Sequence, residues 1–359
     1  MGHVIAISNV KGGVAKTSTT SALGRALSKM GHNILLVDLD AQADLTTSVG
    51  ITLSSVAYGT KDLFTPGLIE KLGVKNFVHA TIYEKLDIIP SKGEIDWYDK
   101  GLMEANDRLL SAFFDSQFRS RYDFIIMDCA PAINVYALNA LTAADLVIVP
   151  TQAEFFSANS LIKMMRVIRH VRQNGRPDLA YRVLVTMYSQ RTRIQRTVME
   201  EFRNGFGENL FATTIEIDTK IRESQSAHTP IIDYRPISRG AIQYQNLASE
   251  VLAFFKQPVQ SVAPIPLTEQ KTAKTEETAQ TFCPFLGFKD DLKTVMNYPS
   301  DLNHCHRASK PAAPKLGHQA THCLTQAYLG CPMLQTSKKI SLPTELQERP
   351  PSLWNKLGF

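Results

Sequence analysis

A short glycine-containing segment, VKGGVAKTS at residues 10–18, has the residue types and the spacing of a phosphate-binding loop. Gly12 and Gly13 leave room for backbone N–H groups to turn toward anionic oxygens. Lys16 can reach the β- and γ-phosphates of a nucleotide, and Thr17 can coordinate Mg²⁺ through its hydroxyl. A strand-like run precedes the loop and a helical pattern follows it, so a helix N-terminus adds its positive end. The sequence therefore predicts a nucleotide site made by Lys11, Gly12, Gly13, Val14, Ala15, Lys16, Thr17 and Ser18.

Two apolar runs further along the chain end in aspartates. LLVDLD carries Asp38 and Asp40, whose i, i+2 spacing points both side chains to one side at the carboxyl end of a predicted strand, where ligands bind in open α/β sheets. YDFIIMD ends in Asp128, a carboxylate that is costly to desolvate unless a metal or a donor meets it, and Mg²⁺-bound water is the natural partner. A turn or cap acid is the alternative for Asp38. Cys129 is interpreted as a packing residue rather than a redox or metal-binding one.

The loop departs from the common GxxxxGK[ST] pattern, because Val10 and Ala15 occupy its two glycine positions. It resembles instead the KGGxxK[ST] form of the ParA/MinD family of P-loop ATPases. In that family the lysine corresponding to Lys11 crosses to the nucleotide of the neighbouring subunit, as a cation supplied in trans. The resemblance implies a Mg²⁺-dependent ATPase that forms a sandwich homodimer with ATP, with Lys11 and Lys16 as catalytic residues. A solvated loop lysine is the alternative for Lys11.

Two other segments support this resemblance. DLDAQAD at 38–44 resembles the family's DxDPQGN segment, which implies that Asp40 is catalytic and positions the attacking water, and that Asp38 supports the Mg²⁺ shell. DCAP, which begins at Asp128, resembles the DCPP ending of the family's Walker B strand, although alanine replaces the first proline. The resemblance thus implies an Mg²⁺ site made by Thr17, Asp38 and Asp128.

The elements that must position these residues follow from an alternation of short β-rich runs and longer helical patterns over residues 1–255. Nearly continuous apolar runs are typical of buried parallel strands. The alternation predicts an α/β fold of the P-loop NTPase type, with a mostly parallel sheet covered by helices on both faces. Gly31 is expected to end the first helix. Strands are expected at Val4–Ser8, Ile34–Asp38, Leu86–Pro90, Phe124–Asp128, Leu146–Pro150, Arg182–Thr186 and Leu210–Thr214, and helices at Thr17–Met30, Leu161–Gln173 and Ala241–Phe255.

The composition is that of a globular protein, since 44% of the 359 residues are hydrophobic and 20% are charged. The formal net charge of +5 is too modest to separate a nucleic-acid binder from many enzymes. No apolar run approaches the roughly 18 to 20 residues of a membrane helix, and no basic region with a cleavage site precedes HVIAIS, so a cytoplasmic protein is expected. We expect an ATPase domain at 1–255, a flexible linker at 256–281, a small Cys/His module at 282–334 and a polar tail at 335–359.

Four of the five cysteines, Cys283, Cys305, Cys323 and Cys331, lie in the C-terminal module at spacings of 22, 18 and 8 residues. A segment of about fifty residues with few core-forming side chains is too small to be held by burial alone, so a cross-link is expected. Because cytoplasmic disulfides are disfavoured, zinc or an iron–sulfur cluster is the leading interpretation. Free structural thiols and disulfides are the alternatives.

Cations gather on predicted loops and helix starts between residues 191 and 239, which suits DNA binding without sequence preference. Arg191 matches the arginine of the family's DxRT loop. Lys220 lies where an arginine of the family's NVRLSEAPS segment is found, and Arg222 is an added charge. A solvated charged face is the alternative. The cations are Arg191, Arg193, Arg196, Arg203, Lys220, Arg222, Arg235 and Arg239.

The resemblance covers about residues 3–255 and implies a partition-type ATPase on the nucleoid. It would position or segregate a plasmid, a chromosome region or a protein cargo, with hydrolysis stimulated by a ParB-like or cargo-adaptor partner. No membrane contact is expected, because the last core helix leads into a proline-containing linker rather than a basic amphipathic tail. Two other functions stay open: an iron–sulfur cluster carrier or reductase-type ATPase, although the core holds only Cys129, and a MinD-like regulator that cycles on a membrane.

Overall fold

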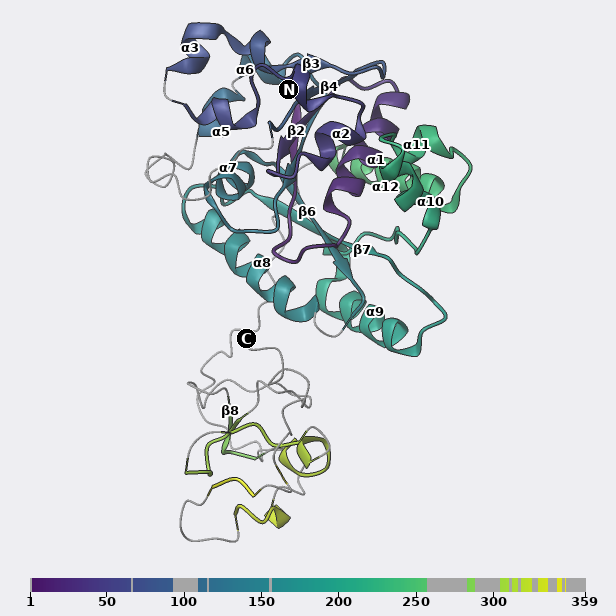
Figure 1. Cartoon of the computed structure of the whole chain (residues 1–359). Coiled ribbons are helices and arrows are strands. Elements are labelled where there is room, and N and C mark those ends of the chain that lie inside the picture. Colours follow the sequence, from purple (N-terminus) through teal and green to yellow (C-terminus); the bar gives the residue numbers. More distant parts are fainter. Residues whose placement is uncertain are drawn as a thin grey trace. The chain divides into compact units, whose positions relative to one another are not determined.

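The computed structural model divides into two compact units, Met1–Thr268 and Glu269–Phe359 (Figure 1). In the first unit the described residues are 2–65, 67–92, 109–114, 116–154 and 157–256. In the second unit they are 283–287, 304–309, 312–315, 318–324, 329–334, 341–343 and 346. The expected linker and the expected polar tail therefore lie outside the described residues, apart from Lys256 and residues 341–343 and 346.

A seven-stranded sheet forms the centre of the first unit. Its order is β3-β4-β2-β5-β1-β6-β7, and every neighbouring pair is parallel except β3 and β4. The mostly parallel sheet expected from the sequence is confirmed. The strands are β1 His3–Ile7, β2 Ile34–Leu39, β3 His79–Ala80, β4 Leu86–Ile89, β5 Phe124–Cys129, β6 Leu146–Gln152 and β7 Ala180–Thr186.

Side chains of the central strands alternate between two hydrophobic cores, because successive residues of a strand point to opposite faces. In β1, Val4 and Ala6 belong to one core, whereas Ile5 and Ile7 belong to the other. All four side chains are fully buried, as expected for a parallel strand with helices on both of its faces. The continuous apolar run in the sequence thus reflects two cores.

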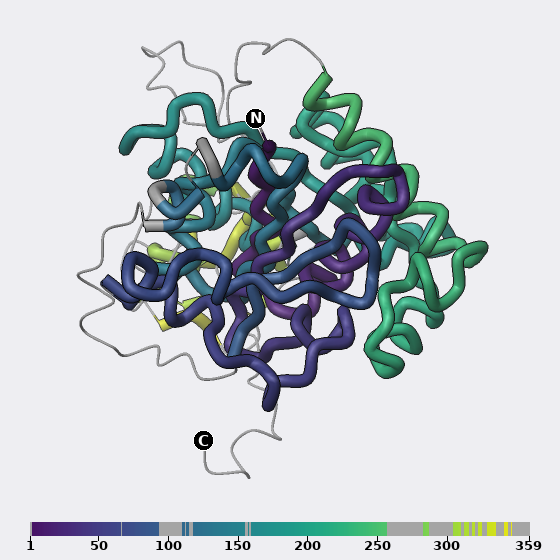
Figure 2. The backbone as a smooth tube through the Cα atoms, turned by 90° about the horizontal axis from the view of Figure 1, so that it is seen from above, coloured from purple at the N-terminus to yellow at the C-terminus, as the bar shows by residue number. Residues whose placement is uncertain are grey.

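Helices cover both faces of the sheet (Figure 1). On one face α1 packs against α11 and α12, and on the other α7 packs against α8. Viewed from above, the last helices of the first unit, drawn in green, lie together on one side of the molecule, next to the purple N-terminal segment (Figure 2). The helices are α1 Lys16–Lys29, α2 Asp44–Ser48, α3 Leu68–Leu72, α5 Leu109–Phe113, α6 Ser116–Arg119, α7 Val135–Ala143, α8 Ser157–Gln173, α9 Arg193–Phe206, α10 Thr219–Ser226, α11 Ile231–Tyr234 and α12 Arg239–Lys256. Short 3-10 turns are η1 Leu53–Ser55, η2 Thr60–Phe64, η3 Val74–Phe77 and η4 Gly207–Asn209.

The three helices expected from the sequence are confirmed, with small shifts at their ends. Gly31 follows α1 with a φ of +99°, a conformation that residues with a side chain rarely adopt, so its role as a helix stop is also confirmed.

The strand expected at Leu210–Thr214 is wrong. An isolated bridge at Leu210 and one hydrogen bond, from the Phe211 N–H to the Val183 carbonyl at 3.0 Å, join this segment to β7 without forming a strand. The N–H groups of Ala212 and Thr213 donate to the carboxylate of Glu250 in α12, at 3.0 and 2.7 Å, so a side chain takes the place of a strand partner. The sequence reading also missed β3, a strand of two residues that pairs antiparallel to β4.

The second unit has little regular structure among its described residues. β8 Leu286–Gly287 and β9 His304–Cys305 form an antiparallel pair, and η5 Gln319–Cys323 makes a helical turn. Its four cysteines are buried and free, so the disulfide alternative is not supported.

Within the described parts of the chain, no helix is long and apolar enough to cross a membrane.

Candidate functional site

The glycine-containing loop between β1 and α1 lines a cavity of about 390 Å³. A Cβ atom built on Gly12 or on Gly13 would meet no other atom within 4 Å, so the backbone of the loop faces open space. A volume of this size is ordinary for a small-molecule site. The loop therefore fits the phosphate-binding role that the sequence predicts, with the start of α1 directly behind it.

Two alanines, Ala15 in the loop that lines this cavity and the buried Ala43 next to the lining residue Asp44, adopt the left-handed conformation. Ala15 has a φ of +66° and precedes α1, and Ala43 has a φ of +55° and precedes α2. They occupy the positions where the resembled family segments have glycine. For a residue with a Cβ atom, the left-handed conformation is less favourable than the right-handed one by about 1 kcal/mol or more. The carbonyl groups of both alanines accept the first hydrogen bond of the following helix, from Thr19 and Thr47, so the helices hold the strained backbone in place.

Ala15→Gly is expected to raise the unfolding free energy of the full chain by about 1 kcal/mol, because glycine removes the left-handed strain. The greater conformational freedom of glycine in the unfolded chain offsets part of this gain. Urea unfolding followed by circular dichroism measures the change. Ala26→Gly, in the buried middle of α1, is the matched control and should destabilise the protein by about 1 kcal/mol or more. A lower unfolding free energy for Ala15→Gly would contradict the strain.

Lys16 and Asp128 lie near enough at the base of the loop to influence each other's charge. The Lys16 Nζ donates to the carbonyl of Lys11 at 3.2 Å. Burial lowers the pKa of Lys16, an effect that the nearby Asp128 opposes. Burial, and then the neighbouring Asp38, raise the pKa of Asp128 well above its usual range. Burial thus disfavours the charged form of both groups, and a phosphate beside Lys16 and Mg²⁺ beside Asp128 would each stabilise that charged form.

The hydroxyl of Thr17 donates to Asp128 at 2.6 Å, and the hydroxyl of Thr20 lies 3.4 Å from the other oxygen of that carboxylate. A hydroxyl and a buried carboxylate side by side are the hard oxygen donors that Mg²⁺ takes in proteins. These residues fit the predicted Mg²⁺ site, in which the ion would supply positive charge to the phosphates.

Asp38 lies beside Asp128 in the sheet, because the two residues are register partners on β2 and β5. It is fully buried, and its carboxylate accepts the Thr46 N–H at 2.9 Å, the Thr46 hydroxyl at 2.6 Å and the Asp40 N–H at 3.1 Å. Burial raises the pKa of Asp38 to about 6 despite these bonds. Protein donors thus surround this carboxylate, as the alternative of a turn or cap acid predicts, and an Mg²⁺ role stays a prediction.

Asp40 differs from Asp38 in that it lines the cavity. Its carboxylate accepts the N–H of Gln42 at 3.0 Å and is partly exposed. Asp40 is therefore a carboxylate with access to a bound nucleotide and to water.

Lys11 reaches away from its own cavity. Its Nζ donates to Gln152 at 2.9 Å, to Glu154 at 3.1 Å and to Ser157 at 3.3 Å, at the junction of β6 and α8. The pair with Glu154 is partly exposed. The sequence places Lys11 in the same loop as Lys16, but the structure directs the two ammonium groups to different surroundings. A move of Lys11 toward a second subunit would break these three contacts.

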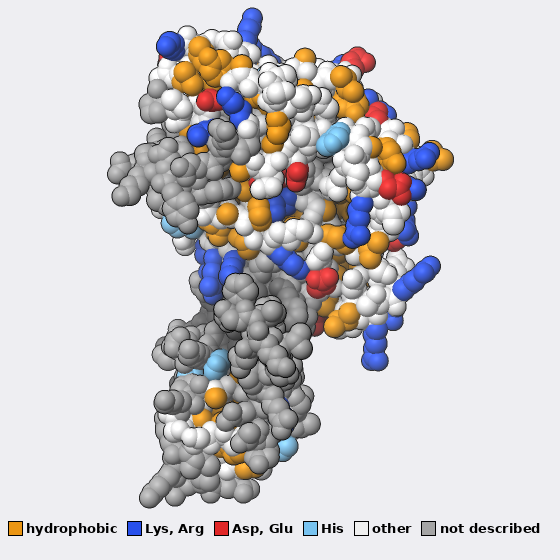
Figure 3. Space-filling model, viewed as in Figure 1, with side chains coloured by type: hydrophobic (Ala, Val, Ile, Leu, Met, Phe, Trp, Pro, Cys, Tyr) orange, Lys and Arg blue, Asp and Glu red, His pale blue; other side chains and the backbone are white. Residues whose placement is uncertain are grey.

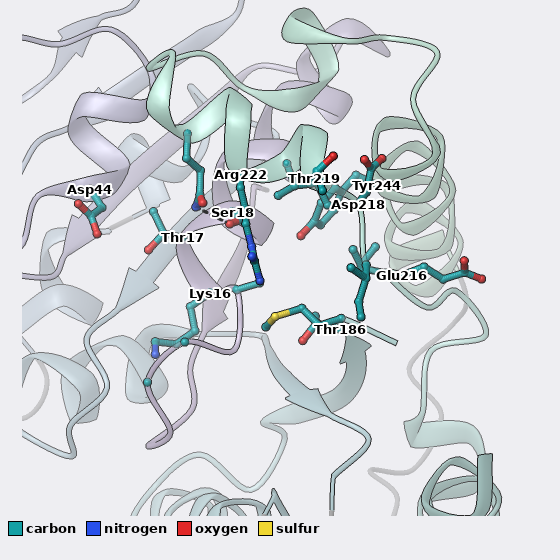
Figure 4. Close-up of a pocket in the computed structure, with 18 of the residues that line it drawn as sticks. Lys16, Thr17, Ser18, Asp44, Thr186, Glu216, Asp218, Thr219, Arg222 and Tyr244 are labelled. Carbon is teal, nitrogen blue, oxygen red and sulfur yellow. Dashed lines mark hydrogen bonds between the residues drawn. The ribbon is translucent and has the colours of Figure 1, made fainter. Parts of the chain in front are cut away.

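The far wall of the cavity comes from segments that sequence reasoning did not assign to it (Figure 4). The side chain of Gln225 in α10 donates to the hydroxyl of Ser18 at 2.6 Å and joins this wall to the loop. Thr186 ends β7 at the carboxyl edge of the sheet, so the rule that ligands bind at this edge could have found it. The wall consists of Thr186, Met187, Ile215, Glu216, Ile217, Asp218, Thr219, Ile221, Arg222, Gln225 and Tyr244.

The three residues predicted to contact DNA do not share one environment. Arg191 is exposed just before α9. Lys220 forms an ion pair with Glu223 at 2.8 Å. Arg222 lines the cavity and points toward the loop that carries Lys16 (Figure 4). The structure therefore separates Arg222 from the other two and places it on the wall of the cavity.

Comparisons with known proteins agree with this geometry. A family model described as an AAA domain matches residues 2–181. The sporulation initiation inhibitor protein Soj of Bacillus subtilis is 36% identical over 256 residues, which is 70% of this chain and 99% of Soj. Cobyrinic acid a,c-diamide synthase of Mycobacterium smegmatis, solved with ADP and magnesium, matches 74% of this chain and all of its own with a TM-score of 0.60 and 28% identity. The septum site-determining protein MinD of Pyrococcus horikoshii, solved with Mg-ADP, matches 72% of this chain and all of its own with a TM-score of 0.56 and 26% identity.

Proposed function

Because the chain belongs to the ParA/MinD family of P-loop ATPases, we propose that its first unit is an ATP-driven switch that binds DNA as a homodimer and positions a cargo. The chain is an ATPase that uses a nucleotide and magnesium. The observation that supports the dimer proposal is that the Lys11 ammonium lies outside its own nucleotide cavity, where it contacts Gln152, Glu154 and Ser157. A lysine in this place is available to the nucleotide of a second subunit.

Within one nucleotide site each residue has a separate role. Lys16 and the backbone of Gly12 and Gly13 bind the phosphates, and Thr17 and Asp128 hold Mg²⁺. Asp40 positions the attacking water, because it lines the cavity and is partly exposed, whereas Asp38 of the same strand end is fully buried. Asp38 keeps Asp40 and α2 in place through its hydrogen bonds, and supports the Mg²⁺ shell from behind.

The dimer would act at the nucleoid of the cytoplasm. A ParB-like or cargo-adaptor partner would stimulate hydrolysis and so release the dimer, and the cargo would be a plasmid, a chromosome region or a protein assembly. The ATPase domain at 1–255 would do this without help from the C-terminal module, because each unit has cores of its own. A cluster-carrier role for the first unit loses support, since Cys129, its one cysteine, is 1% exposed and burial raises its pKa to about 12.

The start of α9 is the surface that we propose for DNA. Arg191, Arg193 and Arg196 are all exposed there, within six residues of chain. Figure 3 shows Lys and Arg side chains projecting from the first unit over the region of α9 and α10. Arginines that reach out from a helix start can contact backbone phosphates irrespective of the base sequence. Lys220 would add to this surface once a phosphate competes with Glu223. Arg222 is also predicted as a DNA contact, and because it lines the cavity we leave it out of this surface.

Duplex DNA of any sequence is expected to bind when ATP is present, and not with ADP or without nucleotide. Titrations at several salt concentrations should give a linear fall of log affinity with log salt. Arg191→Glu, Arg193→Glu and Arg196→Glu together should abolish binding, and single changes should flatten the salt slope by about 0.9 or less each. ATP hydrolysis without a partner should stay unchanged, because Arg222 is left in place.

A second triple variant controls for net charge. Lys71→Glu, Lys75→Glu and Arg121→Glu change the charge equally at exposed positions outside α9, and should leave DNA binding within about threefold. Binding that ignores the nucleotide would refute the coupling. Failure to bind DNA, together with recruitment to anionic vesicles, would assign the protein to the MinD-like membrane class.

A further inference from the structure

The four cysteines of the second unit, expected from the sequence to hold zinc or an iron–sulfur cluster, line a cavity of only about 10 Å³. Among the described residues of the chain, no three His, Cys, Asp or Glu side chains are grouped so that they could hold a metal ion. The described residues of the second unit therefore support neither zinc nor a cluster.

Arg222 in α10 differs from the other cations predicted to contact DNA, because it lines the nucleotide cavity of the first unit. Gln225, three positions later on the same helix, donates a side-chain hydrogen bond to the Ser18 hydroxyl at 2.6 Å. Residues three apart on a helix lie on one face, so this face of α10 is directed at the start of α1. Figure 4 shows the Arg222 side chain extending from α10 toward the loop that carries Lys16.

Six charged side chains of the described residues line this cavity, and two of them are cations. Glu216 pairs with Arg239 at 2.7 Å, and Asp218 accepts two backbone N–H groups, both at 2.9 Å. No ion pair of the Arg222 guanidinium is found within the described part of the chain. Because Arg222 is also exposed, a bound anion could pair with it without breaking an existing ion pair. The six residues are Lys16, Asp40, Asp44, Glu216, Asp218 and Arg222.

Arg222 lies between two parts of the cavity that suit different parts of a nucleotide. Lys16 and Thr17 suit the terminal phosphates and Mg²⁺. Met187 and Tyr244 offer the apolar and aromatic surface that suits a base. Figure 4 shows Arg222 between Thr17 and Tyr244. Because the α-phosphate joins the base and ribose to the terminal phosphates, Arg222 stands where the α-phosphate is expected.

The charge of Arg222 is a feature of this chain. In the NVRLSEAPS segment that residues 218–226 resemble, serine stands at the position of Arg222. A serine side chain is too short to reach across the cavity, so a contact made by Arg222 would be an addition to the phosphate loop. Arg222→Ser is accordingly the variant that removes the charge with the residue of the resembled segment.

We propose that Arg222 binds the α-phosphate of the nucleotide, as a second cation beside Lys16 from the same subunit. The proposal rests on the nucleotide-binding role proposed for the loop. A guanidinium presents paired N–H donors that match two oxygens of one phosphate. This contact is the same with AMP, ADP and ATP, and it does not change when the bond to the γ-phosphate breaks. It therefore contributes to affinity and not to the rate of the chemical step.

Arg222→Ser in the full chain is expected to lower the affinities for ATP, ADP and AMP by the same factor, about tenfold, as the loss of a charge-assisted hydrogen bond implies. The affinity for adenosine should change by less than about twofold, because adenosine has no phosphate for the guanidinium to contact. Arg222→Lys keeps the charge but loses the paired donors, and should lower the three nucleotide affinities by about threefold. Competition against a fluorescent ADP analogue measures all four ligands.

Steady-state hydrolysis gives a second measurement. With Arg222→Ser the KM for ATP should rise about tenfold while kcat stays within about twofold, the signature of a contact that is equal in the ground state and the transition state. A variant that merely deformed the cavity would also weaken adenosine. Arg121→Ser is the matched control, since Arg121 is an exposed arginine that does not line the cavity, and it should leave all affinities within about twofold.

Unchanged ATP affinity in Arg222→Ser would overturn the proposal, and a loss of DNA binding in that variant would return Arg222 to the DNA surface. A loss confined to ATP would place the contact on the γ-phosphate, and a loss with ATP and ADP but not AMP would place it on the β-phosphate. Either result would refute the assignment to the α-phosphate. Unsubstituted protein that binds no nucleotide would instead refute the proposed function, so the two failures are distinguishable.

Discussion

Lys16→Ala is expected to abolish nucleotide binding, whereas Lys11→Ala is expected to keep it and to lose the ATP-dependent dimer. The Lys16 ammonium is buried beside Asp128 at the base of the phosphate loop. Its loss should lower the affinity for ATP at least about 100-fold, because removing one partner of a desolvated charge pair costs about 2–5 kcal/mol of binding free energy. The Lys11 ammonium contacts Gln152 and Glu154 instead, so its loss should change ATP affinity by less than about threefold.

The rate of ATP hydrolysis should also distinguish the role of Lys11 from that of Lys16. Without Lys11 the phosphates lack the charge supplied from the second subunit, and turnover should fall about 10³-fold or more. Calorimetry with a non-hydrolysable ATP analogue measures affinity, and light scattering measures the dimer. Glu154→Gln is the companion variant: it removes a partly exposed ion pair worth less than about 1 kcal/mol and should strengthen the dimer by less than about fivefold. Equal loss of nucleotide affinity in both alanine variants would remove the case for a lysine acting in trans.

Much of the fold could be predicted because the central strands are buried on both faces. Residues 4–7 are all apolar because their side chains alternate between two cores, and the apolar residues of β2 and β5 alternate between the same cores. The segment Leu210–Thr214 looks similar in sequence, but Glu250 takes two of its N–H groups. A local sequence pattern cannot predict a hydrogen-bond partner that lies in a distant helix. A strand of two residues such as β3 is likewise too short to give a periodic signal.

Part of the candidate site could likewise be predicted from the sequence, and part could not. Lys16, Thr17, Asp40 and Asp128 follow from motifs that lie next to strands, and the structure brings them to one edge of the sheet. Arg222 could not be predicted there, because a charge in a sequence shows no direction and α10 reaches the cavity only through the course of the chain after β7. The sequence shows only that Ala15 stands at a glycine position of the common loop pattern, and the observed φ of +66° shows that its backbone is strained.

Asp40→Ala is expected to trap the dimer with ATP bound. Water positioning fails without this carboxylate, and hydrolysis should fall about 10²- to 10⁴-fold, the usual contribution of such a group. Phosphate and Mg²⁺ contacts come from Lys16, Thr17 and Asp128, which the change leaves in place, so ATP affinity should stay within about threefold. Single-turnover hydrolysis and gel filtration with ATP measure the two effects.

Asp44→Ala is the matched control for that prediction. Asp44 lines the same cavity from the first turn of α2 and carries the same charge, yet it lies four residues further along and is exposed. Its loss should change hydrolysis by less than about threefold, which would show that the effect of Asp40 is one of position and not of charge in the cavity. An Asp40→Ala protein that stays monomeric with ATP would refute the water-positioning role, because a failure confined to the chemical step leaves the ATP-bound dimer intact.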